Sequence, residues 1–425
     1  MTLITRRRFA TTGAASAAGL ATFSGPWRLN RAYAQAKPIR IGLTCDATGI
    51  YGTSGLDELR GIRMAIAECN AKGGVLGRRI EAVTADTETN PDRGAHVARY
   101  LINTKDCSLL IGAIHSGVAQ AITAVAASRG VVYLNTNSSA ASQAQVDCSR
   151  VKFVWDANGT NFAKAAVMNA VQSIGRRWVL LANDSAWGRS AQSATRTLVQ
   201  SAGGIVVEAI LVPESTRDFA ATLRKIHDIA PDVVATAVGG DDIQALRQQV
   251  VAQKLDGKPA WVGSQQDWPD IWNVRTNVFG AFGTTWYHKL KLPGVAEFVR
   301  RWQAFNTDGG VPVPGNVSYN GYMATRELLA AIERAGSANN IAIIKQLENL
   351  KVPAQDRMQH FDAYMNPLTH HMQQTIYLAR KNLRPADDTD LFEIISWCQP
   401  AAVADPAAEA LCRMVPYDQV PVVDS

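Results

Sequence analysis

The chain has 425 residues, of which 47% are hydrophobic and 19% charged; these proportions exclude a disordered chain and one embedded throughout in a membrane. Its formal charge of +6 is concentrated in residues 1–34, which hold five arginines and no acidic residue, and the remainder carries 38 basic and 37 acidic residues. A nearly neutral remainder argues against nucleic acid as a partner, and the length predicts two lobes.

Residues 1–34 have the features of an export signal. The run Arg6-Arg7-Arg8 precedes an aromatic residue, residues 10–23 are only mildly apolar, and small residues lie at the cleavage position. The pattern resembles a twin-arginine signal, so we predict export to the periplasm and cleavage near Ala34. The alternatives are a general secretory signal and an uncleaved anchor, because residues 9–27 are uncharged.

A βαβ unit is predicted next. Residues 39–45 form a short apolar strand, residues 56–70 have helical spacing, and residues 80–85 form a second strand. The connecting loop contains Gly49, Gly52 and Gly55, whose spacing differs from the G-x-G-x-x-G dinucleotide pattern. An ordinary flexible turn is the simpler alternative.

Two more strands end in small, polar loops that lead into helices. The strand at residues 109–112 is followed by His115 and Ser116, and the strand at residues 131–134 is followed by residues 135–139. Free amides and the dipole at a helix N-terminus favour an anion, so a carboxylate is expected between Ser116 and Ser138 or Ser139. The alternative is that these residues only cap helices.

From residue 153 the pattern restarts, and a second βα array of similar size follows. We therefore predict an α/β fold with two doubly wound lobes and a cleft between them. The predicted strands of the second array are residues 178–182, 205–212, 233–238 and 260–263, and the later chain is predicted to form helices at 297–305, 319–334 and 341–350 and strands at 364–374 and 376–379.

Histidines and cysteines give little sign of a metal site. His370 and His371 are adjacent on a predicted strand and so face opposite ways, and His115 has no suitably spaced companion. The six cysteines fit an oxidising compartment, and no C-x-x-C motif occurs. We predict a Cys398–Cys412 disulfide, which would close about fifteen residues and contribute roughly 3 kcal/mol. Cys107 with Cys148 is a second candidate pair.

Three spaced motifs point to a family. Gly49-Ile-Tyr51-Gly52, the run Asn-Ala-Lys-Gly-Gly-Val-Leu-Gly-Arg at residues 70–78, and Asp86-x-x-x-Asn90-Pro91 occur in order. Together they resemble the periplasmic solute-binding proteins of branched-chain amino acid ABC transporters, and the resemblance extends over residues 37–380.

The resemblance implies a type I periplasmic binding protein, with two Rossmann-like lobes joined by a three-strand hinge. The implied first lobe is residues 37–154 plus 287–365, the second is 155–286 plus 366–396, and residues 397–425 form a C-terminal extension. Such a protein is the extracytoplasmic component of an ABC transporter. It captures a small ligand by hinge closure and delivers it to a membrane permease, as a monomer without a cofactor or enzymatic activity.

In the resembled family the two polar turns grip the ligand carboxylate, at positions that match Ser116 and Ser139. An aromatic residue before glycine, here Trp187, lies at the cleft wall, and acids of the second lobe hold an ammonium group. The ligand-binding residues implied for this chain are Tyr51, His115, Ser116, Asn137, Ser138, Ser139, Trp187, Asp241 and Gln265.

This sequence departs from the family pattern at the ammonium end. Gln265 stands where the amino-acid binders commonly have glutamate, and Asp241 stands where they have an aromatic residue. An amide cannot neutralise an ammonium group. Either Asp241 takes that role or the ligand has no ammonium, which leaves amino acids, aromatic or aliphatic carboxylates and short amides open.

Two other functions compete with this interpretation. A periplasmic sensor or receptor component of the same fold closes on a ligand in the same way. A nucleotide-dependent enzyme is the remote alternative, because the sequence contains no G-x-S-x-G, G-x-x-x-x-G-K-[ST] or H-E-x-x-H motif.

Overall fold

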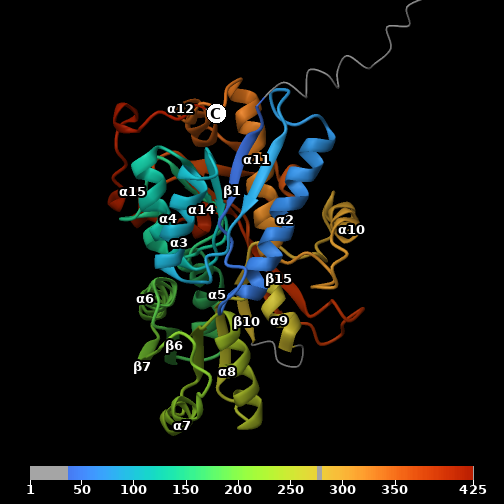
Figure 1. Ribbon diagram of the computed structural model, residues 1–425. Coiled ribbons are helices and arrows are strands. Elements are labelled where there is room, and N and C mark those ends of the chain that lie inside the picture. The colour runs from blue at the N-terminus through green and yellow to red at the C-terminus, as the bar shows by residue number, and fades with distance from the viewer. Residues whose placement is uncertain (1–36, 275–279, 425) are drawn as a thin grey trace, which may run out of the picture. The chain divides into compact units, whose positions relative to one another are not determined.

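The polar strand-to-helix loops lie at the ends of strands in two separate sheets in the computed structural model, which describes residues 37–274 and 280–424 (Figure 1). This two-lobe α/β arrangement confirms the predicted fold class. The predicted export signal at residues 1–34 lies outside the described residues. Among the described helices, none combines the length and apolarity needed to span a bilayer.

The first lobe is built on an eight-stranded sheet in the order β11-β12-β13-β5-β4-β3-β1-β2. Six of its strands pair in parallel: β1 (Ile39–Leu43), β2 (Ile80–Thr84), β3 (Leu109–Gly112), β4 (Val132–Asn135), β5 (Lys152–Val154) and β13 (His371–Gln373). At the edge, β12 (Ala363–Asn366) pairs antiparallel with both β13 and β11 (Lys351–Val352). Its helices are α2 (Gly52–Ala71), α3 (Pro91–Asn103), α4 (Ser116–Arg129), α10 (Val295–Phe305), α11 (Asn316–Ala335), α12 (Asn340–Glu348) and the short α13 (Ala354–Arg357).

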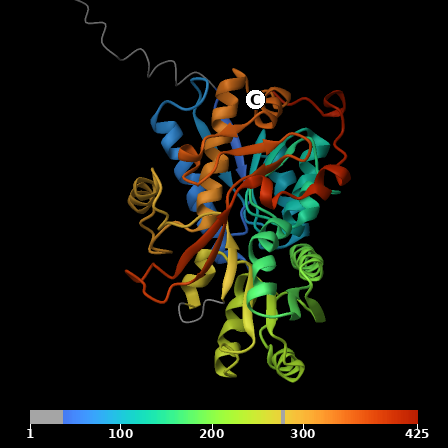
Figure 2. The same ribbon diagram turned by 180° about the vertical axis from the view of Figure 1, so that it is seen from behind.

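Helices from opposite ends of the chain complete this lobe. The blue helix α2 and the orange helix α11 lie side by side in both views (Figures 1 and 2). Their close approach needs Gly61, because a β-carbon there would lie 2.0 Å from the carbonyl oxygen of Ser318. The late helices therefore pack as part of the first lobe, as the resemblance implies.

The second lobe has a seven-stranded sheet in the order β15-β14-β10-β9-β8-β6-β7. Its strands are β6 (Arg177–Asn183), β7 (Ile205–Val212), β8 (Val233–Ala237), β9 (Ala260–Gln265), β10 (Ala281–Thr284), β14 (Ile376–Lys381) and β15 (Phe392–Cys398). Its helices are α5 (Gly159–Ser173), α6 (Ala186–Ser201), α7 (Ala220–Ile229), α8 (Gly240–Ala252) and α9 (Trp268–Val274).

Strand β6 shows why both faces of the second sheet are covered by helices. Its side chains alternate between faces, and both faces are apolar. Val179 and Leu181 belong to one buried cluster with residues of α7 and α8, whereas Trp178 and Leu180 belong to another with residues of α5 and α6. A sheet with helices on both faces is the doubly wound layer arrangement.

The glycine-rich loop after β1 serves helix packing. Helix α2 begins at Gly52, earlier than the predicted start at residue 56, so Gly52 and Gly55 lie within its first turn. A β-carbon on Gly55 would lie 1.9 Å from the carbonyl oxygen of Asp46, and Gly49 has a φ of +83°. These glycines allow a tight turn and a close approach between helix and strand end.

The third passage of the chain between the lobes comes later than predicted. We expected the second lobe to resume at residue 366, but β13 pairs with β5 and β12 in the first sheet. The hairpin of β12 and β13 extends the edge of that sheet, so the chain crosses at residues 374–375, just before β14.

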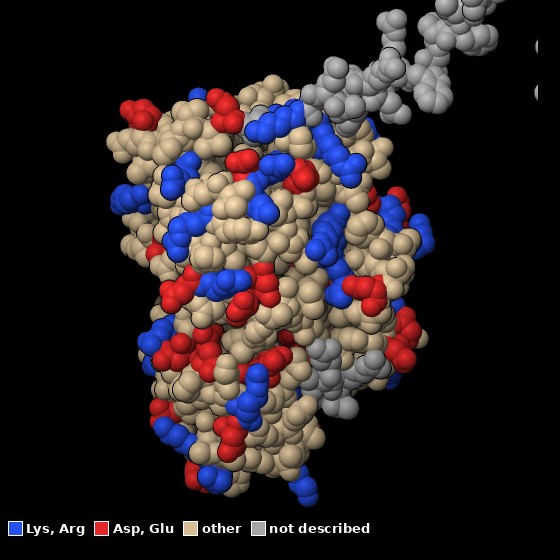
Figure 3. All heavy atoms as spheres, viewed as in Figure 1, with Lys and Arg blue, Asp and Glu red and all other residues tan. Residues whose placement is uncertain are grey.

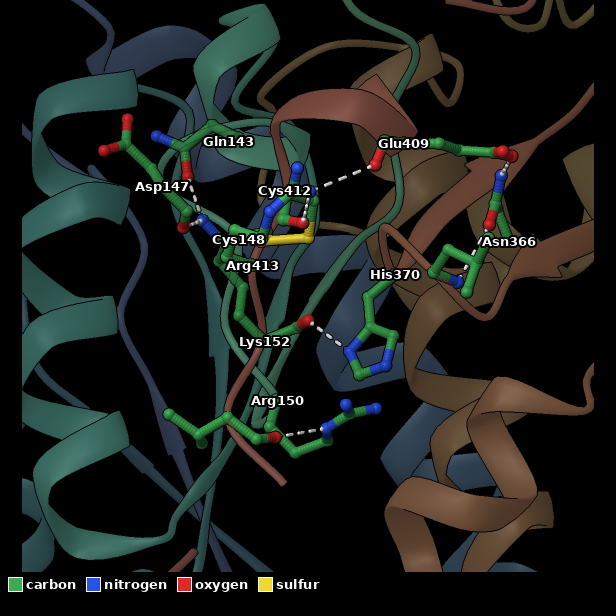
Figure 4. Close-up of a disulfide and its surroundings, with 12 residues drawn as sticks. Gln143, Asp147, Cys148, Arg150, Lys152, Asn366, His370, Glu409, Cys412 and Arg413 are labelled. Carbon is green, nitrogen blue, oxygen red and sulfur yellow. Dashed lines mark hydrogen bonds between the residues drawn. A yellow bond between two sulfur atoms is a disulfide. The ribbon is translucent and has the colours of Figure 1, made fainter. Parts of the chain in front are cut away.

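The predicted Cys398–Cys412 disulfide is wrong. Cys412 is bonded to Cys148, with their Cα atoms 5.6 Å apart, and Cys398 and Cys107 are free thiols (Figure 4). Cys398 ends strand β15 of the second lobe, whereas the tail beyond it returns to the first lobe through α15 (Pro406–Leu411), which contacts the 3-10 turn η1 (Ala141–Ala144). Proximity in sequence misled the prediction because the chain changes lobe between the two cysteines.

Hydrogen bonds continue the attachment of the tail to the first lobe. The Tyr417 hydroxyl donates to Glu348, whose Oε1 also accepts from Arg150 Nη1 at 2.7 Å. Further along, the backbone N–H of Asn340 donates to the carbonyl of Val423 at 3.0 Å.

On the face seen in Figure 3, basic and acidic side chains are interspersed.

Cys148→Ser should destabilise the protein by about 2–5 kcal/mol under oxidising conditions, because the bond closes a loop across 264 residues and restricts the unfolded chain. Urea unfolding with and without reductant measures the difference. Cys398→Ser is the matched control and should leave the free energy of unfolding within about 1 kcal/mol. A large loss from Cys398→Ser with none from Cys148→Ser would contradict the observed pairing.

Candidate ligand-binding cleft

A cavity lies where the polar loops of the two lobes face each other. The first lobe contributes the loops before α2 and α4 and after β4, and the second contributes the starts of α6, α8 and α9. The lining residues are Tyr51, Ile114, His115, Ser116, Asn137, Ser139, Ser185, Trp187, Val238, Gly239, Ile243, Arg247, Gln265, Gln266, Asp267 and Asp270.

Two buried carboxylates hold the first-lobe loops in place. Asp46 Oδ2 accepts the backbone N–H groups of Ile114 at 2.7 Å and His115 at 2.8 Å, which ties the end of β1 to the loop before α4. Glu58 Oε1 accepts from Asn137 Nδ2 at 2.7 Å. Burial raises the pKa of Asp46 and raises that of Glu58 to about 7, so both depend on these donors.

A network of amides and carboxylates lies between the lobes. The side-chain amide of Gln265 donates to Asp156 Oδ2 at 3.0 Å and to Asp267 Oδ1 at 3.1 Å. Asp156 also accepts from Ser139 Oγ at 3.0 Å, and Asp267 from Asn316 Nδ2 at 2.7 Å. A buried carboxylate, Asp156, and a half-buried one, Asp267, thus share one amide group.

Burial controls the titration of this network. Desolvation, followed by the charge of Asp267, raises the pKa of Asp156 to about 7. Desolvation also raises the pKa of Asp267, against hydrogen bonds from Asn316 and Gln265 that lower it. The cavity wall therefore favours a ligand group that offers positive charge or hydrogen-bond donors.

Seven of the nine predicted ligand-binding residues line the cavity: Tyr51, His115, Ser116, Asn137, Ser139, Trp187 and Gln265. Ser138 does not; it is fully buried beside the cavity, in a turn closed by its N–H donating to Asn135 Oδ1 at 3.1 Å. Asp241 does not either, because in the first turn of α8 its side chain is half-exposed and paired with Arg217 at 3.2 Å. Asp241 is therefore not placed to receive an ammonium group.

Sequence reasoning missed Asp267, Asp270 and Arg247. Asp267 lies two residues after Gln265, in the loop predicted at the end of a strand. Considering the acidic residues next to Gln265 as ligand contacts would therefore have identified it. Arg247 follows Ile243 by one helical turn on α8, and both line the cavity. No local pattern signals that an arginine in a polar stretch of helix is fully buried.

Hydrogen bonds join the two lobes around the cavity. The N–H of Asp241 donates to the Ile50 carbonyl at 2.9 Å, and the N–H of Ala141 donates to Ser190 Oγ at 3.0 Å. His115 Nε2 lies 3.1 Å from Glu214 Oε1. The rim is thus fixed by backbone groups and by one histidine–carboxylate pair, which gives His115 a contact across the cleft.

Histidines elsewhere have structural partners. His370 Nε2 lies 2.8 Å from Glu348 Oε1, and its ring stacks on Phe153 (Figure 4 shows its Nδ1 contact with Lys152). His371 Nε2 contacts the Asp156 carbonyl at 2.8 Å. Within residues 37–274 and 280–424, no group of three or more His, Cys, Asp or Glu side chains is placed to hold a metal ion.

Comparison with known proteins gives a consistent set of matches. The family model described as periplasmic binding protein matches residues 38–388. Leu/Ile/Val-binding protein homolog 7 of Brucella abortus is 24% identical over 337 residues, which cover 74% of this chain and 82% of that protein. Leu/Ile/Val-binding protein BraC3 of Rhizobium johnstonii is 25% identical over 308 residues, covering 71% and 81%.

Solved structures share the fold. A periplasmic binding protein of Burkholderia mallei superposes with a TM-score of 0.81 at 22% identity, covering 88% of this chain and 99% of that one. An R. palustris solute-binding protein in complex with 4-hydroxybenzoate has a TM-score of 0.77 at 20% identity, covering 85% and 97%. The Brucella ovis protein that binds leucine, isoleucine, valine, threonine and alanine, in a closed conformation, has a TM-score of 0.77 at 20% identity, covering 89% and 100%.

Without ligand, stability should fall as the pH rises from about 4 to 7. The pKa of Asp156 is about 7 in the folded state and about 3.9 when unfolded, so the folded state retains a proton that the unfolded state has released. In the Asp156→Asn variant, the loss of stability between low and high pH should be smaller by up to about 4 kcal/mol. Urea unfolding at pH 4.5 and 8 measures it.

The matched control for that experiment is Asp228→Asn, which changes an exposed aspartate of α7. It should keep the pH dependence of the wild type. If Asp156→Asn also keeps that dependence, Asp156 is ionised throughout the range and the expectation fails.

Proposed function

Because the chain belongs to the periplasmic binding protein family, we propose that it is the extracytoplasmic substrate-binding component of an ABC transporter. The observation that carries the proposal is the cavity between the lobes, with hydroxyl and amide groups on one side and buried carboxylates on the other. The relatives reported above are named as binding proteins, which confirms the prediction that the chain is not an enzyme.

The first-lobe side of the cavity supports recognition of a carboxylate. Ser116 lines the cavity as the first residue of α4, where the helix dipole favours negative charge, and its Oγ accepts the backbone N–H of Ala140 at 3.2 Å. The Ser139 hydroxyl lines the same wall and donates to Asp156. A ligand carboxylate here would accept from Ser116 and the helix N-terminus.

The second-lobe side supports an ammonium group. Asp267 occupies the cavity wall two residues beyond Gln265 and supplies the charge that the amide lacks. The described lining holds Asp267 and Asp270 with Arg247, so a lone carboxylate would enter a wall that already has an excess of acids. A zwitterionic α-amino acid matches both sides, and we therefore place it ahead of a plain aromatic or aliphatic carboxylate.

Ligand capture then follows from contacts that exist only while the lobes are together. The bonds of Asp241 with Ile50 and of His115 with Glu214 belong to that state. A ligand that contacts both lobes shifts the population toward it, and the permease reads the closed form. Export through a twin-arginine signal cleaved near Ala34, and a monomeric state, complete the proposal.

Ser116→Ala combined with Ser139→Ala should weaken binding of L-leucine, used as a probe α-amino acid, by about 10- to 100-fold. Each hydrogen bond to a charged group contributes roughly 1.5–3 kcal/mol, and partial replacement by the helix amides reduces the loss. Isothermal titration calorimetry measures the affinity. Ser128→Ala, near the other end of α4, is the control and should bind normally. Unchanged affinity in the double variant would contradict the carboxylate assignment.

Asp267→Asn should weaken binding of α-amino acids at least tenfold and leave plain carboxylates unaffected or tighter, because only the former bring an ammonium group. A thermal-shift panel of L-leucine, L-glutamine, 4-hydroxybenzoate and NAD tests this, since a ligand at 100 times its Kd stabilises by about 2.7 kcal/mol. Binding of 4-hydroxybenzoate alone would replace the amino-acid proposal. A response to NAD alone would refute the transporter function.

A further inference from the structure

One part of the cavity wall is ionic. Arg247 of α8 is fully buried and Asp270 of α9 is 5% exposed, and both line the cavity. Arg247 Nη1 donates to the backbone carbonyl of Asp270 at 3.5 Å, and Nη2 donates to Gln266 Oε1. Asp270 Oδ1 accepts from Ser54 Oγ of the first lobe at 3.3 Å. The Arg247 guanidinium thus contacts the backbone of Asp270 within the second lobe, and the Asp270 carboxylate contacts Ser54 of the first lobe.

Because Arg247 and Asp270 are buried, the ligand group that lies against them strongly affects the affinity. Because both groups are buried, desolvation lowers the pKa of Arg247 to about 10 and raises that of Asp270 to about 7. An aliphatic side chain in contact with them would offer neither a donor nor an acceptor, and sites built for hydrogen bonding reject such ligands strongly.

Two more donors line the same cavity. Gln266 Nε2 and Trp187 Nε1 are buried and have no hydrogen-bond partner among the described residues. Gln266 cannot exchange its amide atoms, because its oxygen receives the Arg247 hydrogen bond. This part of the wall therefore offers hydrogen-bond donors beside the carboxylate of Asp270.

The charges of the pair select among ligand groups. A distal ammonium or guanidinium group would face Arg247, and a distal carboxylate would face Asp270 with Asp267 nearby. An uncharged carboxamide avoids both repulsions, because its oxygen accepts from Arg247 or Gln266 while its NH2 group donates to Asp270.

We propose that Arg247 and Asp270, with Gln266, form a second polar subsite that binds the side-chain carboxamide of an α-amino acid. The inference rests on the proposed function and narrows its ligand class. It gives this chain a preference that differs from the branched aliphatic ligands in the names of its relatives.

Isothermal titration calorimetry of the purified chain with L-glutamine, L-glutamate and L-leucine tests the subsite, because the three side chains are similar in size. L-glutamine should bind at least tenfold more tightly than either of the others. The inference is overturned if L-leucine, L-glutamate or 4-hydroxybenzoate binds as tightly as L-glutamine. Absence of binding by every probe would refute the proposed function together with the subsite, so the two failures are distinguishable.

Substitutions of Arg247 and Asp270 test whether the preference for L-glutamine depends on these two residues. Arg247→Met should lower affinity for L-glutamine at least tenfold and change that for L-leucine less than threefold. Asp270→Asn keeps the shape of the site and should also reduce the preference for L-glutamine, which keeps the test valid if Arg247→Met fails to fold. Arg224→Met, at an exposed position of α7, is the matched control. Preservation of the wild-type preference in a folded Arg247→Met or Asp270→Asn variant would overturn the assignment.

Discussion

Buried carboxylates at the strand ends are the constraint on which the cleft depends. Asp46 holds two backbone amides of the loop before α4, and Asp156 joins the first crossing to Gln265 of the second lobe. A buried carboxylate is tolerated only when donors surround it, so each fixes the backbone segments that supply those donors. The same property makes the site receptive, because acids held at a raised pKa gain more from a cationic or donor-bearing ligand than exposed acids would.

The C-terminal tail provides a second constraint, which is covalent through its disulfide to the first lobe. The tail also contacts α5 of the second lobe, where Asn161 Nδ2 donates to the carbonyl of Val403 at 2.6 Å. Cys148 follows η1, and the disulfide to Cys412 secures the tail against the turn that also carries Ala141 at the lobe contact. Lys152 lies beneath this region with Nζ donating to Gln143 Oε1 at 2.8 Å and to the Asp147 carbonyl at 2.7 Å (Figure 4). Burial lowers its pKa to about 7, so the lysine too is retained by local acceptors.

Much of the fold was predictable because apolar runs and polar loops are local features. The strands ending near Gly112 and Asn135 are short buried segments, and the loops after them carry residues that reach the cavity. Pairing between distant segments was not predictable in this way. Cys412 bonds to a residue 264 positions away, and β13 joins the first sheet through β5. The prediction that Asp241 binds the ligand failed for a related reason. The family resemblance gives the position of a residue along the chain, but the orientation of helix α8 about its axis decides which of its side chains face the cleft.

If the protein closes on its ligand as proposed, the acids and the lobe contacts together determine how the ligand controls closure. Bonds such as Asp241 N–H to the Ile50 carbonyl favour the state with the lobes together, whatever the ligand. Burial of Asp156, Asp267 and Asp270 in that state opposes it, because their ionised forms lose water. A ligand that supplies hydrogen-bond donors to these acids offsets the lost hydration that opposes closure, and the favourable contacts between the lobes remain. The closing equilibrium is then set by the difference in ligand affinity between the two states, so the chemistry that selects the ligand is also the chemistry that closes the cleft.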